Sequence, residues 1–154
     1  MLHPVPQQIK LPPAFEIRDW EQFLQDGEAF LKTATGAFSR KKRAFTPEIL
    51  YNIIAMAIEK FVMAALMRAG VMPCNHTMAD LVEAMEKTFP GALTNIRKNL
   101  LALDKYQEIC DVDNFRMTSP GLDEIPAMLE LAERLHFLVT NDLMESSWRS
   151  GNRA

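Results

Sequence analysis

Cysteine and histidine are scarce in this chain, which has two cysteines and three histidines among 154 residues. Cys74 and Cys110 do not make a disulfide framework, and free thiols are typical of a reducing cytosol. A zinc site needs four ligands, usually in two spaced pairs. Cys74 and His76 form one pair and the sequence offers no second, so we predict neither a metal nor another cofactor.

Several motifs of catalysis and ligand binding are also missing from the sequence. It contains no glycine-rich phosphate loop and no G-x-S-x-G. Asp111 begins a stretch that resembles a calcium loop, but the sixth position is Arg116 instead of glycine and the twelfth is Leu122 instead of glutamate. A cysteine nucleophile at Cys74 would lack a third group to orient His76. We therefore assign no catalytic residue from these motifs.

A strong net charge and a long apolar run are absent as well. The formal net charge is −3, so no global field favours nucleic acid or a membrane. Charged residues interrupt every apolar stretch before it reaches about 18 residues. The N-terminus lacks the basic and apolar regions of a signal peptide. We expect a cytoplasmic protein that makes no membrane contact.

One local concentration of positive charge remains, the basic run Arg40, Lys41, Lys42 and Arg43. Four cations on one loop predict contacts with phosphate groups, each of which adds to a salt-dependent affinity. The alternative interpretation is a solvated loop without a ligand.

The feature around which the chain is organised is an apolar helix predicted over residues 46–70. Thr46 is a good N-cap, Pro47 suits the first helical position, and Gly70 suits the left-handed conformation that ends a helix. Residues three, four or seven apart share a face. The face predicted to lie in the core comprises Leu50, Ile53, Ile54, Ala57, Ile58, Phe61 and Ala65.

Helical periodicity predicts four further helices, over residues 19–38, 78–87, 93–110 and 123–145. Asp19 and Gln22 resemble a capping box at the start of the first of them. Gly27 lies on its apolar stripe, where close approach of another helix would offset the cost of glycine. No segment has a strand pattern. We predict an all-α, up-and-down bundle of four main helices plus a short extra helix over residues 18–146, preceded by an extended proline-rich arm (1–17) and followed by a flexible tail (147–154).

The second face of the 46–70 helix is a candidate surface for self-association because methionine adapts to irregular partners. The candidate interface residues are Asn52, Met56, Glu59, Lys60, Met63 and Met67, with Phe137 on the polar side of the last helix as a further contact. Alternatively, other helices of the same chain cover this face. Glu59 and Lys60 would then reach solvent at its rim, or pair with Arg97, Asp104 or a second subunit.

The sequence AIEKFVMAALMRAGVMPCNHTMADLVEAM resembles the second helix and following link of HEPN domains, helical domains named for nucleotide binding in prokaryotes and eukaryotes. The matching residues are Glu59, Lys60, Gly70, Pro73 and His76, and the resemblance extends over residues 19–146. It implies a bundle of four main helices that pairs into a dimer. Many such domains are RNA-cleaving toxins or partners of nucleotidyltransferases.

The catalytic signature of that family, an arginine followed after four to six residues by a histidine, is missing here. The resemblance therefore predicts a non-catalytic, homodimeric binding module whose ligand is a nucleotide or RNA. The alternative is a divergent ribonuclease or toxin–antitoxin component that uses Arg116, Arg134 and His136. A third hypothesis is a purely structural subunit of a larger assembly.

Overall fold

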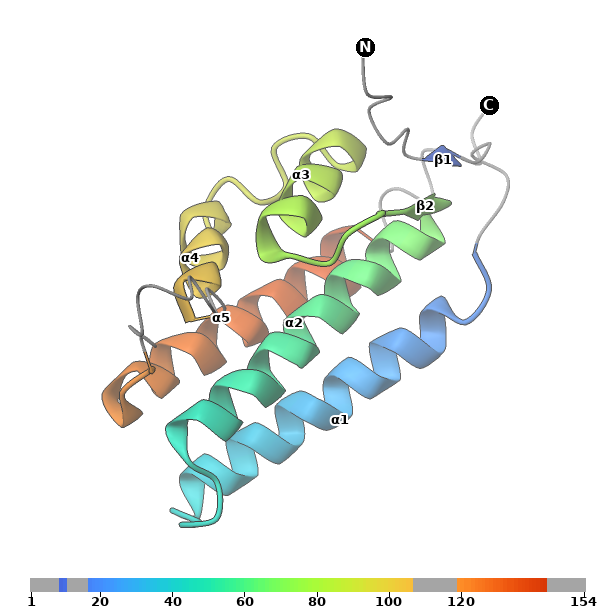
Figure 1. Cartoon of the computed structure of the whole chain (residues 1–154). Helices are drawn as coiled ribbons and strands as arrows, with labels where there is room; N and C mark the ends of the chain where they lie inside the picture. Colours follow the sequence, from blue (N-terminus) through green and yellow to red (C-terminus); the bar gives the residue numbers. More distant parts are fainter. Residues whose placement is uncertain (1–8, 11–16, 107–118, 144–154) are drawn as a thin grey trace.

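The computed structural model describes residues 9–10, 17–106 and 119–143, and its fold is the predicted all-α helical bundle (Figure 1). The long helices are α1 (Trp20–Ser39), α2 (Pro47–Arg68) and α5 (Ile125–Phe137). The shorter elements are α3 (Met78–Thr88), α4 (Arg97–Ala102), two 3₁₀ turns (Leu103–Tyr106 and Leu122–Glu124), a π-helical segment (Leu138–Leu143) and the strands β1 (Ile9–Lys10) and β2 (Val71–Met72). The predicted tail, most of the predicted arm, Cys110 and Arg116 lie outside the described residues.

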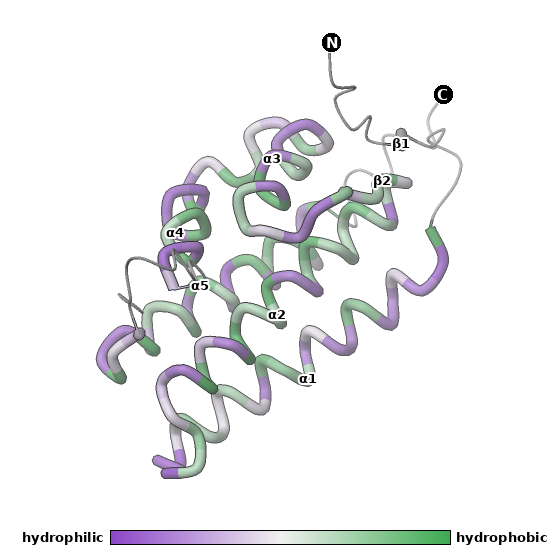
Figure 2. Tube along the Cα trace, viewed as in Figure 1, coloured by the Kyte–Doolittle hydropathy of each residue, from purple (hydrophilic) through white to green (hydrophobic). Residues whose placement is uncertain are grey.

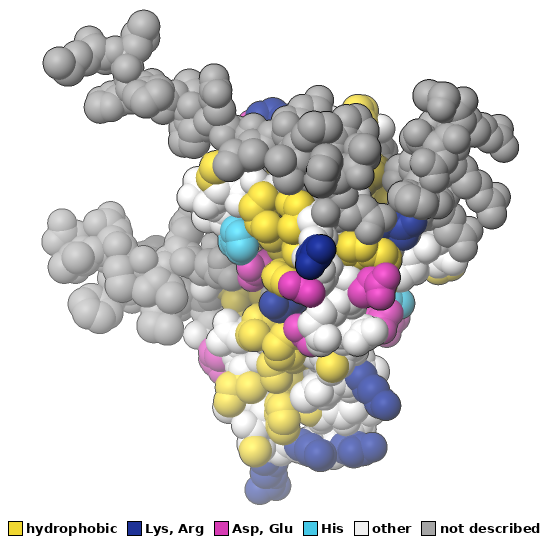
Figure 3. All heavy atoms as spheres, turned by 90° about the vertical axis from the view of Figure 1, so that its right-hand side faces the viewer, with side chains coloured by type: hydrophobic (Ala, Val, Ile, Leu, Met, Phe, Trp, Pro, Cys, Tyr) yellow, Lys and Arg dark blue, Asp and Glu magenta, His cyan; other side chains and the backbone are white. Residues whose placement is uncertain are grey.

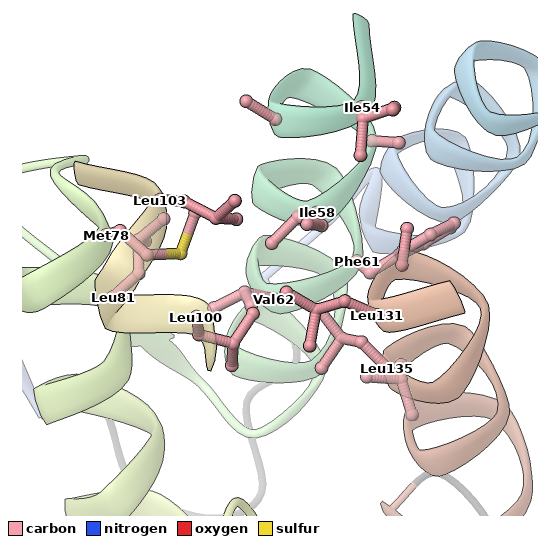
Figure 4. Packing of buried hydrophobic residues seen from close by; sticks show 14 of the residues in the cluster. Ile54, Ile58, Phe61, Val62, Met78, Leu81, Leu100, Leu103, Leu131 and Leu135 are labelled. Atoms are coloured by element: carbon pink, nitrogen blue, oxygen red, sulfur yellow. The ribbon is translucent and has the colours of Figure 1, made fainter. Parts of the chain in front are cut away.

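Helix α2 is the centre of the bundle, with α1 and α5 beside it and α3 and α4 across another side (Figure 1). Its ends are those predicted: the Thr46 hydroxyl accepts a hydrogen bond from the Ile49 amide at 3.3 Å, and Gly70 has φ 77°. By length and composition α2 is apolar enough to cross a membrane, yet 67% of that stretch is buried inside the bundle. Figure 4 shows Ile58 and Val62 of α2 between Leu100 and the leucines of α5.

Helix α1 packs against α2 through Gly27, so the predicted close approach is confirmed. A methyl group built on Gly27 would lie only 2.7 Å from Cε1 of Phe61, closer than real contacts allow. Ala34 and Ala37 are further small residues of α1 that are buried. Figure 2 shows that hydrophobic and hydrophilic residues alternate along α1.

Three local predictions were wrong. Asp19 has φ 72° and caps no helix through its side chain, and Gln22 instead donates to Asp26 at 2.8 Å. Of the helix predicted over residues 93–110, the described part (93–106) is helical only in α4 and the 3₁₀ turn that follows it, and residues 107–110 lie outside the described residues. Strands also exist, since β1 and β2 pair antiparallel with Ile9 opposite Met72. Two residues are too few for an alternating pattern to reveal a strand in the sequence.

The turn after α4 is tied to the rest of the bundle by its polar groups. The Tyr51 hydroxyl of α2 donates to the Leu103 carbonyl at 3.0 Å within the core. Tyr106 packs its ring on Tyr51 at 5.1 Å and donates its hydroxyl to Glu124. Burial, followed by that hydrogen bond, raises the pKa of Tyr106. These contacts fix the end of this turn against α2 and the start of α5.

Candidate functional site

A groove between α1, the loop that follows it and α5 contains part of the predicted basic run. Its volume is about 690 Å³. We call it the basic groove; it is lined by Glu28, Leu31, Lys32, Thr33, Thr35, Gly36, Ala37, Arg40, Lys42, Phe45 and His136. Arg40 and Lys42 therefore share a cavity with Lys32, an association that the sequence did not predict. Lys41 and Arg43 are exposed but are not among the lining residues.

The backbone at the end of α1 determines which residues of the basic run line the groove. The Lys42 amide donates to the Ala37 carbonyl and the Lys41 amide to the Phe38 carbonyl, the two bonds of a Schellman ending. Lys41 occupies the left-handed position of this motif, with φ 50°. Glycine is usual there because a side chain in that conformation costs about 1–2 kcal/mol. The left-handed Lys41 thus ends α1 and separates Arg40 and Lys42, which line the groove, from each other along the backbone.

The wall of the basic groove formed by α5 contributes a histidine held in place by two contacts. Nε2 of His136 lies 2.9 Å from Oε1 of Glu28 on α1. The His136 ring also packs on Phe61, with centroids 4.9 Å apart. The imidazole is about one-third exposed and the Glu28 side chain nearly half exposed, so the pair is open to a ligand in the groove.

Some residues of the predicted interface on α2 are buried in the fold, and others are exposed. Met63 and Met67 are 1% and 3% exposed, so these two residues are buried within the chain and offer no surface to a partner. The reason is that neighbouring elements cover all of residues 61–67 of α2. Asn52 and Met56 remain exposed, and Phe137 is the most exposed of the large hydrophobic residues described.

Glu59 and Lys60 lie at the rim of the bundle, which agrees with the rim interpretation, but their partners differ from those predicted. Oε1 of Glu59 lies 2.7 Å from Nδ1 of His76, just before α3. The Lys60 ammonium lies 4.1 Å from the centroid of the Phe23 ring. Arg97 pairs instead with Glu86. The two charges are therefore satisfied within the chain.

Exposed and partly buried apolar side chains occur along both of the packed helices α1 and α2. They include Ile49, Ile53 and Met56 of α2 with Phe23 and Phe30 of α1, which together we call the α1–α2 stripe. Ile49 and Met56 are 42% and 43% exposed. Figure 3 shows hydrophobic side chains gathered in a band on one face of the molecule, with Lys and Arg side chains at its lower end. The spacing of 49, 53 and 56 was a signal in the sequence, but only the fold packs α1 with its Phe23 and Phe30 against α2.

Arg134 and His136, the two described residues of the ribonuclease hypothesis, do not converge within one chain. His136 lines the basic groove, whereas Arg134 lines a separate groove on the other side of α5. Cys74 is exposed, and the described residues contain no group of three or more His, Cys, Asp or Glu side chains suited to a metal.

The fold and this site define an all-α bundle protein with a basic surface groove. A scan against protein-family models, a search of curated proteins and a search of solved structures each found no match to this chain.

Proposed function

We propose that this protein is a HEPN-like, homodimeric binding module that holds the phosphate groups of a nucleotide or RNA strand in the basic groove. The observation that carries this proposal is the gathering of Lys32, Arg40 and Lys42 around one cavity, beside the His136–Glu28 pair. Lysine and arginine are the side chains that bind phosphate oxygens best, and arginine does so with a planar pair of donors. Thr35 adds a hydroxyl group along the same wall, whereas the Thr33 hydroxyl donates to the Ala29 carbonyl.

The division of the basic run supplies a matched test of groove binding. We expect Arg40→Gln with Lys42→Gln to lower the slope of log affinity against log salt by about 1.4, because each phosphate contact on a single strand contributes about 0.7. Lys41→Gln with Arg43→Gln removes the same charge outside the groove and should change the slope less. The measurement is fluorescence anisotropy of labelled oligouridylate across a salt series, with ATP as competitor to distinguish nucleotide from RNA binding.

Equal losses in the two double variants would contradict groove binding and indicate non-specific attraction to the loop. Failure of wild type to bind either oligouridylate or ATP would overturn the proposal.

A second candidate function, RNA cleavage by a divergent ribonuclease, is favoured by the His136–Glu28 pair. A carboxylate that holds one imidazole nitrogen leaves the other to act as a base. In that role His136 would accept the proton of a ribose 2′-hydroxyl; the oxygen would then attack the adjacent phosphorus, and the 5′-oxygen would leave with a proton from solvent. A toxin–antitoxin role would follow from this activity.

Incubation with RNA separates the two candidate functions. A ribonuclease should cleave the oligouridylate, and His136→Ala should lower its rate at least about 100-fold, the range for removing a general base. The control is Phe137→Ala, which changes the adjacent residue outside the basic groove. Cleavage that persists unchanged in His136→Ala removes His136 from the mechanism. If the wild type does not cleave RNA, the binding module is the function that remains.

For the dimer, the α1–α2 stripe is the surface we propose, because a band of exposed apolar side chains is typical of protein contacts. Light scattering across a dilution series should give twice the monomer mass of 17.5 kDa. Ile49→Lys with Met56→Lys should shift the protein to the monomer, since the partner would have to bury two charges. Leu122→Lys, which changes an exposed leucine elsewhere, should not. A wild-type monomer at every concentration would contradict the dimer.

A further inference from the structure

A second groove lies on the opposite side of α5 from the basic groove and has the opposite charge. Its volume is about 430 Å³. We call it the Phe137 groove; it is lined by Ala92, Asn95, Ile96, Glu130, Glu133, Arg134, Phe137, Leu138 and Asp142. Three carboxylates and one guanidinium give this lining a formal charge of −2. The phosphate-binding proposal makes no use of this site.

The groove also presents an exposed aromatic ring. Phe137 is 63% exposed, although Ile96 and Leu138 beside it are buried or partly buried. A phenyl ring at a hydrophobic floor, surrounded by carboxylates, offers apolar contact and a cation–π surface together. Aromatic residues of this kind are enriched at the centres of protein interfaces.

A change in helix type brings the charged and aromatic groups of this groove together. Phe137 and Asp142 are five positions apart, which on an α-helix separates two side chains by about 140° around the axis. The segment Leu138–Leu143 is π-helical, and bonding between residues five apart brings such positions to one side. Both residues accordingly line the same groove.

Side chains of the π-helical segment support this local geometry. The Thr140 hydroxyl donates to the His136 carbonyl at 2.8 Å, and the side-chain amide of Asn141 donates to the Phe137 carbonyl at 3.1 Å. These bonds occupy backbone acceptors where the helix changes register. Single π turns within α-helices are frequent at functional sites.

We infer that the Phe137 groove docks a cationic segment of a partner protein, in which an aliphatic side chain lies beside lysine or arginine. The aliphatic group packs on Phe137 and Ile96, and the cations face Glu130 and Glu133. The negative charge of the lining argues for this occupant over RNA, whose phosphates these carboxylates would repel. The segment leaves the basic groove free, so the protein would link a phosphate-bearing ligand to a protein partner.

The test uses the full-length protein and three labelled octapeptides. These are Gly-Arg-Leu-Gly-Arg-Leu-Gly-Arg, the same peptide with serine for leucine, and the same peptide with glutamate for arginine. We expect saturable binding of the arginine–leucine peptide in fluorescence anisotropy, at least fivefold weaker binding of the serine peptide, and no binding of the glutamate peptide. Phe137→Ala and Glu130→Gln with Glu133→Gln should each weaken the first peptide at least fivefold.

Two controls change similar side chains elsewhere and should leave its binding unaltered: Leu122→Ala and Glu83→Gln, both at exposed positions. Equal binding of the serine peptide, or binding of the first peptide that Phe137→Ala leaves intact, would overturn the inference. So would dissociation of the dimer in Phe137→Ala, because the occupant would then be a second copy. None of these three results bears on oligouridylate binding, so the two proposals fail separately.

Discussion

Phe61→Ala is expected to lower the free energy of unfolding by about 3–5 kcal/mol, the range for deleting a buried phenyl side chain. Phe61 is fully buried and contacts both neighbouring long helices, Gly27 on α1 and His136 on α5. Its removal therefore opens a cavity where three helices meet. Urea unfolding followed by circular dichroism measures the change, at one fixed protein concentration because a dimer makes stability concentration-dependent.

The contact with Gly27 provides a control for this prediction, because the effect of Gly27→Ala on the free energy of unfolding should reverse its sign when Phe61 is replaced. In wild type, Gly27→Ala gains about 1 kcal/mol of helix propensity but forces its methyl into Phe61, at a cost of about 1–3 kcal/mol. We expect a net loss. In the Phe61→Ala background the clash with the ring is gone, and the remaining contact with Cβ of Lys60 at 3.1 Å requires only a small shift, so Gly27→Ala should stabilise. Stabilisation of equal size in both backgrounds would show that α1 can move away from α2 without cost.

Asp104→Ala is expected to cost about 2–4 kcal/mol, because this carboxylate accepts hydrogen bonds from the first two backbone amides of α3. Its oxygens accept from the Met78 and Ala79 amides, each at 3.1 Å. The next two amides of α3 are bonded to Thr77, through its hydroxyl and its carbonyl. Hydrogen bonds to charged groups contribute about 1.5–3 kcal/mol each.

The comparison for Asp104 is Thr77→Ala, which removes the ordinary N-cap of the same helix and should cost about 1 kcal/mol. Hydrogen exchange of the Met78 and Ala79 amides should accelerate in Asp104→Ala. A loss no larger than that of Thr77→Ala would mean that water replaces the carboxylate fully.

Features that depend on neighbours in the sequence were predictable. Thr46 and Gly70 end α2 because capping and left-handed backbone are properties of single residues. The apolar stripe of α1, with Gly27 as its point of close approach, follows from helical periodicity. By contrast, Met63 and Met67 have the spacing of an exposed face, and nothing local reveals that neighbouring elements cover them.

By itself, the sequence determined an all-α bundle around one apolar helix, and it located the charged run that follows α1. Only the tertiary structure decided that Arg40 and Lys42 share a groove with Lys32, and that His136 meets Glu28, which is 108 positions away. The physical reason is the separation along the chain of the residues that interact. Caps and stripes are set by φ, ψ and a period of 3.6 residues, whereas a groove exists only after helices distant in the chain have packed on α2.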